Sequence, residues 1–89
     1  MEKQWLVYIL RCGDGTLYTG MTDDLSRRLE QHRTGKGAKY TRGRPPLTLV
    51  YSETCINRSH ALRREAAIKR LPRKQKLQLC ESCDLKKFF

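Results

Sequence analysis

Six side chains in this sequence could act together on a phosphodiester bond. Hydrolysis of that bond needs a base that activates water, a cation that stabilises the negative charge developing on the phosphate, and help for the leaving oxygen. A tyrosinate near cations can serve as the base, and the planar fork of an arginine suits phosphate oxygens. A single carboxylate can hold a magnesium ion that keeps most of its water ligands. The candidates for these roles are Tyr8, Tyr18, Arg28, His32, Tyr40 and Glu65.

The two N-terminal tyrosines lie on the arms of a predicted β-hairpin. Residues 5–11 are dominated by apolar, β-branched and aromatic side chains, a pattern typical of a central strand covered on both faces. Residues 16–21 have the composition of its antiparallel partner.

The turn of this hairpin allows two registers. A two-residue loop at 14–15 would place Tyr8 and Tyr18 on opposite faces of the sheet. A three-residue loop at 13–15 would place both rings on one face, as diagonal neighbours. The residues of the turn permit both arrangements.

A helix is predicted for residues 22–33, with Thr22 as its N-cap. Arg28 and His32 are four residues apart, so their side chains lie on the same face of this helix, beside its apolar stripe.

The loop of residues 34–46 is rich in glycine, proline and basic side chains. Flexible backbone with Lys and Arg suits contacts to phosphate, although the same composition fits a solvated linker. The candidate nucleic-acid contacts in this loop are Lys36, Lys39, Tyr40, Arg42 and Arg44.

The second half of the chain predicts one strand and two helices. Residues 47–53 are expected to form a third strand. Residues 59–71 read as a helix with Ser59 as N-cap and Pro72 as its stop, and residues 73–80 as a second, short helix.

Glu65 falls among apolar side chains on a helical wheel of residues 59–71, with Lys69 one turn later on the same side. A carboxylate in a buried stripe is unfavourable unless it is paired or binds a metal ion. Two interpretations stay open: an ion pair with Lys69 or with an arginine of the neighbouring helix, or a functional carboxylate. Lys69 is a further candidate contact for nucleic acid.

The formal net charge of +10 over 89 residues predicts a polyanionic partner. Lys and Arg outnumber Asp and Glu in both halves of the chain, so the charge is not confined to a tail. Nucleic acid is the commonest polyanion that such a surface attracts. No apolar run approaches the ~18 residues of a membrane span, and no signal peptide is evident, so a cytoplasmic location is expected.

The four cysteines are expected to be free thiols, without a disulfide framework. Cys80 and Cys83 form one CxxC pair. A structural zinc site usually needs a second pair or two histidines at ligand spacing, and His32 and His60 lie too far apart in the sequence to supply them.

Taken in order, these motifs resemble the GIY-YIG nucleases. The first motif of that family stands here as Val7-Tyr8-Ile9 and the second as Tyr18-Thr19-Gly20. The stretches GKGAKYTR and ALRREAAIKRL resemble its small stand-alone bacterial branch, and the resemblance covers roughly residues 4–80.

The resemblance implies an α+β fold with a small three-stranded antiparallel sheet flanked by helices. It implies a single GIY-YIG domain over 1–89, with its core at about 4–80 and a C-terminal tail at 81–89. It also implies that both motif tyrosines share one side of the sheet, which requires the three-residue turn.

For function, the resemblance implies a metal-dependent endonuclease acting on DNA. Structure-specific cleavage in repair or recombination is one role that it implies, and an unidentified protein partner is one option for the targeting of the enzyme. Tyr8 would be the general base, and Tyr18 would position the nucleophile or the phosphate. Arg28 would stabilise charge and His32 would hydrogen-bond the tyrosine or relay a proton. Glu65 would hold a single Mg²⁺ or Mn²⁺ ion, and Tyr40 matches the extra tyrosine of the small branch.

A second interpretation is a basic nucleic-acid-binding module whose catalytic residues are vestigial. The complete polar set favours the nuclease, because a decaying site should first lose an unfavourable carboxylate such as Glu65.

Overall fold

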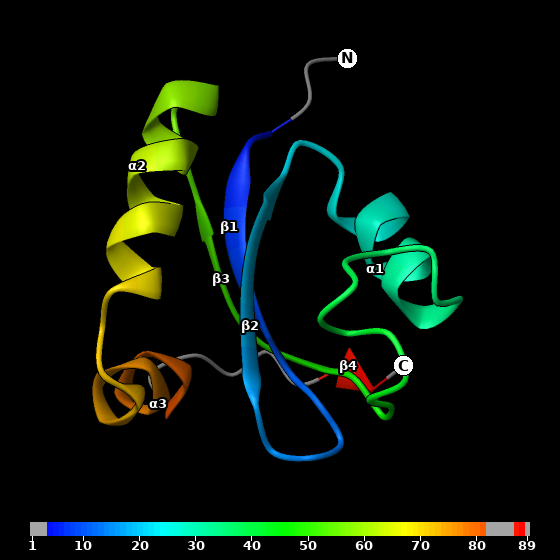
Figure 1. The fold of residues 1–89 in the computed structure, drawn as a ribbon. Helices are drawn as coiled ribbons and strands as arrows, with labels where there is room; N and C mark the ends of the chain where they lie inside the picture. The colour runs from blue at the N-terminus through cyan, green and yellow to red at the C-terminus, as the bar shows by residue number, and fades with distance from the viewer. Residues whose placement is uncertain (1–3, 82–86, 89) are drawn as a thin grey trace.

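Three strands form the antiparallel sheet that the sequence predicts, and a two-residue strand extends one edge (Figure 1). The computed structural model describes residues 4–81 and 87–88. The strands are β1 (Leu6–Arg11), β2 (Leu17–Thr22), β3 (Thr48–Thr54) and β4 (Lys87–Phe88). Their order is β2-β1-β3-β4, and each neighbouring pair is antiparallel. The predicted α+β architecture is confirmed.

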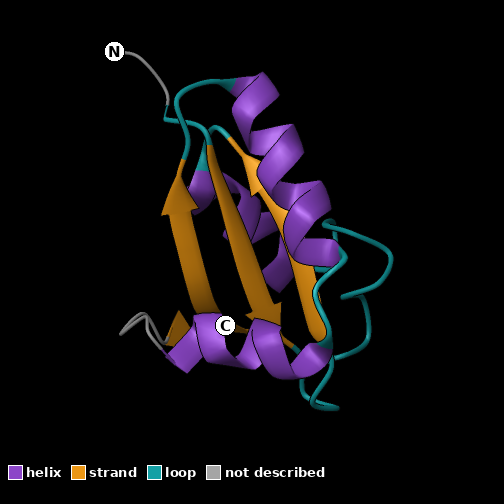
Figure 2. Cartoon of the chain, turned by 90° about the vertical axis from the view of Figure 1, so that its left-hand side faces the viewer, coloured by secondary structure: helices purple, strands orange, loops and turns teal. Residues whose placement is uncertain are grey.

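Three helices cover the two faces of this sheet. They are α1 (Leu25–Arg33), α2 (Arg58–Lys69) and α3 (Arg73–Glu81). In Figure 1, α1 lies on one side of the sheet and α2 on the other. Figure 2 shows α2 running along the strands, while α3 crosses them near one end. None of the helices in the described part of the chain has the length and apolar character needed to cross a membrane.

The central strand β1 contributes to two separate cores, as its unbroken apolar run predicts. Val7 and Ile9 are fully buried on the face covered by α2, where they pack with Ala61 and Ile68. Side chains alternate along a strand, so the residues between them face the other way. Tyr8 and Leu10 belong to the second core, which includes Leu29 of α1.

The hairpin adopts the three-residue turn. Leu10 pairs with Tyr18 and Tyr8 with Gly20, while the Cys12 amide donates to the Thr16 carbonyl at 2.8 Å. The residue closing the loop is Gly15, with φ of +85°, a conformation that glycine adopts without steric cost. Both motif tyrosines therefore lie on one face of the sheet.

Both predicted helix caps are displaced to a neighbouring Asx residue. Asp24 caps α1 by accepting a hydrogen bond from the Arg27 amide, and the Thr22 hydroxyl accepts one from the Asp24 amide instead. Asn57, not Ser59, caps α2. In each helix the Asx side chain reaches the amide three residues later, which fixes where the helix begins.

The loop between α1 and β3 is docked on the hairpin turn and is not a free linker. The Gly13 amide donates to the Arg44 carbonyl at 2.7 Å, and the Arg44 guanidinium is paired with Asp14. A Cβ at Gly13 would lie 2.0 Å from the Pro45 carbonyl oxygen, so only glycine allows this approach.

Cys12 and Cys55 are buried free thiols, and Cys80 is half-buried. The predicted partner of Cys80 in the CxxC pair, Cys83, lies outside the described residues.

Candidate active site

Tyr8 reaches the site by lying across its neighbouring strand at Gly20. A Cβ at Gly20 would stand 2.6 Å from the Tyr8 hydroxyl oxygen and 3.0 Å from a ring carbon of Tyr18. The glycine of the second motif thus leaves the space that the Tyr8 ring occupies. Tyr8 is fully buried, and its hydroxyl lies 2.8 Å from Nε2 of His32.

His32 lies on the last turn of α1, against both motif tyrosines. Its ring centroid is 5.8 Å from that of Tyr8 and 5.3 Å from that of Tyr18, with both pairs meeting edge to face. The other ring nitrogen, Nδ1, is 2.9 Å from Oγ1 of Thr41 in the docked loop. The helix, the hairpin and the loop therefore meet at this imidazole.

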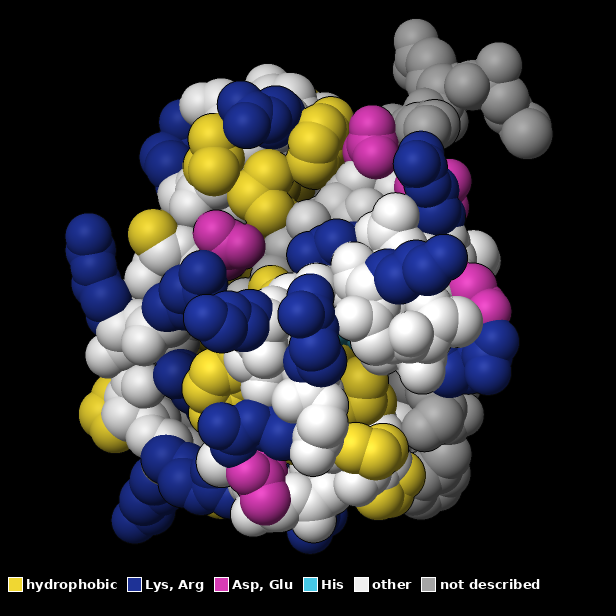
Figure 3. Space-filling model, turned by 45° about the vertical axis from the view of Figure 1, so that its right-hand side comes forward, with side chains coloured by type: hydrophobic (Ala, Val, Ile, Leu, Met, Phe, Trp, Pro, Cys, Tyr) yellow, Lys and Arg dark blue, Asp and Glu magenta, His cyan; other side chains and the backbone are white. Residues whose placement is uncertain are grey.

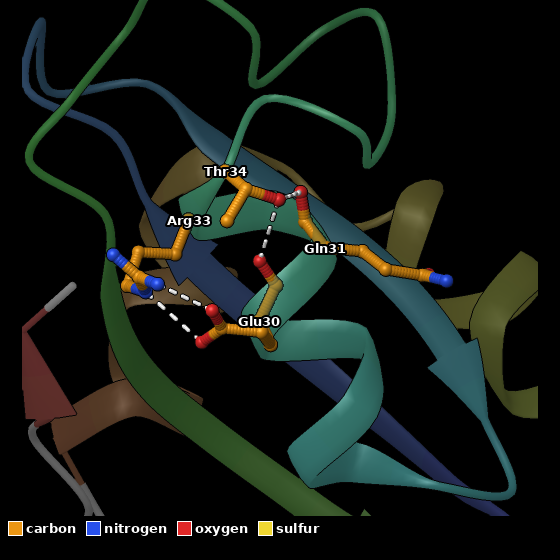
Figure 4. Close-up of polar contacts among 4 residues, drawn as sticks. All are labelled: Glu30, Gln31, Arg33 and Thr34. Atoms are coloured by element: carbon orange, nitrogen blue, oxygen red, sulfur yellow. Dashed lines mark hydrogen bonds and ion pairs between the residues drawn. The ribbon is translucent and has the colours of Figure 1, made fainter.

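Side-chain contacts close the end of α1 beside His32 (Figure 4). Glu30 and Arg33 form an ion pair. The Thr34 hydroxyl donates to the Glu30 carbonyl at 3.0 Å and to the Gln31 carbonyl at 3.3 Å. The same two carbonyls also accept hydrogen bonds from the Thr34 and Lys36 amides. The hydroxyl bonds add to these and help to hold the turn that carries His32.

Burial changes the proton affinity of two ring side chains. Burial raises the pKa of Tyr8 to about 12, although the nearby Arg28 opposes this shift. Burial, together with the charge of Arg28, lowers the pKa of His32 to about 4. At neutral pH the pair is therefore a protonated phenol beside a neutral imidazole.

Arg28 is half-buried on α1 and faces the tyrosines. Its Nη1 donates to the Gln31 side-chain oxygen at 3.0 Å. Burial alone would lower the pKa of this guanidinium, but its interactions with the Tyr8 and Tyr18 hydroxyls outweigh that effect and raise it. Arg28 thus provides a fixed positive charge next to both rings.

Tyr40 extends the aromatic cluster toward the surface. Its ring stacks on Tyr18 with centroids 6.0 Å apart, and the Arg44 guanidinium lies 4.6 Å from its centroid. Tyr40 remains 43% exposed. The loop therefore contributes the Tyr40 ring to the rim of the site. It also contributes the Arg44 guanidinium, which is already paired with Asp14.

Glu65 lies at the edge of the buried face of α2, not in its middle. The apolar side chains around Glu65 on the helical wheel include Leu62 and Ala66, but both are exposed, because α2 packs through Ala61 and Ile68. The Glu65 side chain is 21% exposed, and Oε1 is 3.7 Å from Nζ of Lys69. Its charge is among the causes that raise the pKa of Tyr8, so the carboxylate acts on the ring cluster.

The donors at Glu65 fit a hydrated divalent ion better than a metal held by the protein alone. No group of three or more His, Cys, Asp or Glu side chains that could hold a metal gathers within the described residues. Mg²⁺ commonly takes one or two carboxylates and completes its shell with water and substrate phosphate. A lone, partly exposed carboxylate matches that pattern.

Lys69 and Lys76 line a pocket of about 270 Å³ next to the tyrosines. Tyr18, Thr19 and Tyr40 form part of its other wall. Sequence reasoning missed Lys76, because nothing in the pattern of α3 indicates that this residue lines a pocket together with residues of β2. Thr41 was also missed, since a loop threonine has no periodic signal.

Lys and Arg side chains cover much of the face that carries α1 and the docked loop, with few acidic groups between them (Figure 3). Three of the four predicted Lys and Arg contacts in the docked loop are exposed, namely Lys36, Lys39 and Arg42. The predicted basic surface and the ring cluster thus belong to the same side of the molecule.

Comparison with known proteins gives one consistent family. The model of the GIY-YIG catalytic domain matches residues 4–78. A UPF0213 protein from Oceanobacillus iheyensis is 56% identical over 81 residues, covering 91% of this chain and 94% of that protein. A UPF0213 protein from Halobacterium salinarum is 54% identical over 70 residues, covering 79% and 91%.

Two solved structures have the same fold. The NMR structure of a UPF0213 protein from Bacillus halodurans is 47% identical with a TM-score of 0.57, and covers 88% of this chain and 83% of that one. The NMR structure of a protein from E. faecalis is 43% identical with a TM-score of 0.63, and covers 92% and 90%. The chain therefore belongs to the GIY-YIG family of catalytic domains, which is a nuclease family.

Proposed function

We propose that this protein is a metal-dependent endonuclease that hydrolyses phosphodiester bonds in DNA. The observation that carries the proposal is the 2.8 Å hydrogen bond between the Tyr8 hydroxyl and Nε2 of His32, beside the positive charge of Arg28. This hydrogen bond joins the candidate base, Tyr8, to the neutral His32 imidazole, which can accept the phenol proton.

In this mechanism each member of the cluster has one role. Tyr8 gives its proton to His32 and then takes one from the attacking water. Arg28 stabilises the negative charge on the phosphate, and Tyr18 orients the phosphate or the water.

Glu65 would hold a single Mg²⁺ or Mn²⁺ ion. When bound, the ion would supply positive charge that neutralises phosphate and favours ionisation of nearby acids. Tyr8 needs such help, because its pKa of about 12 keeps the phenol protonated in the free protein.

Phosphate contacts carry no direct sequence information, so we propose recognition of DNA structure rather than sequence. The exposed Lys36, Lys39 and Arg42 and the pocket lysines Lys69 and Lys76 would make these contacts. Branched or damaged DNA, as met in repair or recombination, is the substrate class to test first. A protein partner that delivers the enzyme to such sites belongs to the same proposal.

The deciding experiment compares wild type with Glu65→Gln on labelled duplex, flap, branched and single-stranded DNA, with Mg²⁺, Mn²⁺ or EDTA. We expect metal-dependent cleavage that falls at least about 100-fold in Glu65→Gln while DNA binding is kept. Glu81→Gln is the matched control, because Glu81 is an exposed carboxylate at the end of α3.

A basic nucleic-acid-binding module is the second candidate. The ion pair between Glu65 and Lys69 favours it, because it gives the carboxylate a partner without any metal. Wild-type binding to every substrate without cleavage in any metal would contradict the nuclease and support the module.

A further inference from the structure

The proton of the Thr41 hydroxyl can be assigned from its two partners. Thr41 is buried, and Oγ1 lies 3.0 Å from the Ala38 carbonyl oxygen and 2.9 Å from Nδ1 of His32. A carbonyl oxygen only accepts, so the one hydroxyl proton points to Ala38. The lone pairs of Oγ1 are then left to accept a proton from Nδ1 of His32.

The Tyr8 end of the imidazole leads to the same assignment. If Nε2 carried the proton, it would donate to the Tyr8 oxygen, and the buried phenol would need another acceptor for its own proton. Among the described contacts of the hydroxyl, Arg28 can only donate. The buried phenol is satisfied as a donor only when Nε2 of His32 is the acceptor.

The docked loop is shaped to hold this side of the ring. A Cβ at Gly37 would lie 2.5 Å from Nδ1 of His32, so the backbone approaches the imidazole as closely as glycine allows. The Thr41 amide also donates to the Ala38 carbonyl, at 3.1 Å. The hydroxyl is therefore fixed in place by the backbone turn that carries it.

We propose that Thr41 is a positioning residue that holds His32 in its Nδ1–H tautomer and thereby directs the Nε2 lone pair at the Tyr8 hydroxyl. The tautomer follows from the geometry alone, and its catalytic consequence rests on the proposed function. When Tyr8 acts as base, its O–H bond breaks and an N–H bond forms at Nε2. The product pair is a tyrosinate and an imidazolium, and Thr41 still accepts the Nδ1 proton. The tyrosinate then takes a proton from water as the water oxygen bonds to phosphorus. The P–O bond to the leaving oxygen breaks, that oxygen keeps the electron pair and takes a proton from solvent, and the His32 imidazolium returns its extra proton to solvent.

The test is the nitrogen spectrum of the two histidine rings at neutral pH, with the ¹⁵N shifts of Nδ1 and Nε2 read from long-range ¹H–¹⁵N correlations. His60 is an internal reference with the opposite protonation of Nδ1, because its Nδ1 accepts a hydrogen bond from the Ile56 amide at 3.0 Å. We expect a protonated Nδ1 for His32 and an unprotonated Nδ1 for His60. A His32 ring with its proton on Nε2 in the wild type would overturn the proposal.

Two substitutions separate the hydroxyl from the shape of the side chain. Thr41→Val keeps the size but leaves Nδ1–H without its acceptor, so the His32 shifts should move toward the Nε2–H tautomer. Thr41→Ser keeps the hydroxyl and should keep the wild-type shifts. His60 should not change in either variant, and an unchanged His32 spectrum in Thr41→Val would refute the role of Thr41.

Cleavage rates complete the test. We expect kcat to fall on the order of 10- to 100-fold in Thr41→Val and to be restored in Thr41→Ser. Full activity in a Thr41→Val protein with a shifted tautomer would overturn the positioning role. A wild type that cleaves no DNA yet shows the expected spectra would refute the nuclease and leave the tautomer assignment supported. Should Thr41→Val fail to fold, the wild-type and Thr41→Ser spectra still decide the tautomer.

Discussion

Gly20 stands directly opposite Tyr8 in the pairing of β1 with β2, and the Tyr8 ring occupies the space that a side chain at Gly20 would fill. A methyl group there would meet the hydroxyl oxygen at 2.6 Å. Gly20→Ala should therefore push Tyr8 away from His32 and lower the free energy of unfolding by about 1–3 kcal/mol. Chemical denaturation measures this loss. Gly35→Ala is a useful comparison, since no atom lies within 4 Å of its added Cβ and any effect there comes from its positive φ.

Tyr8→Phe should abolish cleavage while keeping the fold. The ring still fills its place in the core, but the proton donor to His32 is lost, so kcat should fall about 10²- to 10⁴-fold. Tyr51→Phe is the matched control, because burial also raises the pKa of Tyr51 to about 12 and its hydroxyl bonds Glu53 on another part of the sheet. Equal losses in the two variants would show that the effect is structural and not specific to the base.

Stability should fall as the solution is acidified through the range in which His32 would titrate. The pKa of His32 is about 4 in the folded protein and 6.5 in the reference state. Between these values the unfolded chain binds more protons, so the free energy of unfolding decreases as pH falls from 6.5 toward 4, by about 3 kcal/mol.

Denaturation curves across this pH range test the assignment. His32→Gln has no titrating ring and should lack this part of the slope, whereas His60→Gln should retain it. Parallel pH profiles for wild type and His32→Gln would show that the pKa of His32 does not differ between the folded and unfolded states.

Lys69→Met should strengthen Mn²⁺ binding and weaken DNA binding in the same protein. Lys69 is the cation now paired with Glu65, at 3.7 Å, and an ion on this carboxylate would compete with it. Its removal should raise Mn²⁺ affinity several-fold in the absence of DNA, as measured by calorimetry. Lys76→Met is the control, because Lys76 lines the same pocket and should affect only the binding of DNA. Equal Mn²⁺ affinity in wild type and Lys69→Met would argue against Glu65 as the metal ligand.

The elements of the fold follow from the sequence, because periodicity and turn residues report local structure. The residues of the hairpin turn alone do not fix its register, because they allow two solutions, and only the family resemblance indicated the observed one. Two features accompany the observed register. The Tyr8 ring fits over Gly20, far from the turn, and Gly13 contacts Pro45, which lies outside the hairpin.

The position of Glu65 was predicted only in part, for a similar reason. A helical wheel shows where apolar residues gather, but not which of them the sheet covers. Because α2 packs through Ala61 and Ile68, Leu62 is 42% exposed, and the Glu65 carboxylate lies at the edge of the buried face of the helix. Thr41 gave no signal at all, since its role depends on a loop conformation that no periodicity encodes.

The aromatic cluster and the carboxylate come from separate stretches of the chain. Tyr8, Tyr18, His32 and Tyr40 precede β3, while Glu65 follows it on α2. If the proposed function holds, loss of the carboxylate would leave every ring contact in place and would turn the enzyme into a binding protein. On the same proposal, relatives with an intact ring cluster and a changed residue at the position of Glu65 would bind nucleic acid without cutting it.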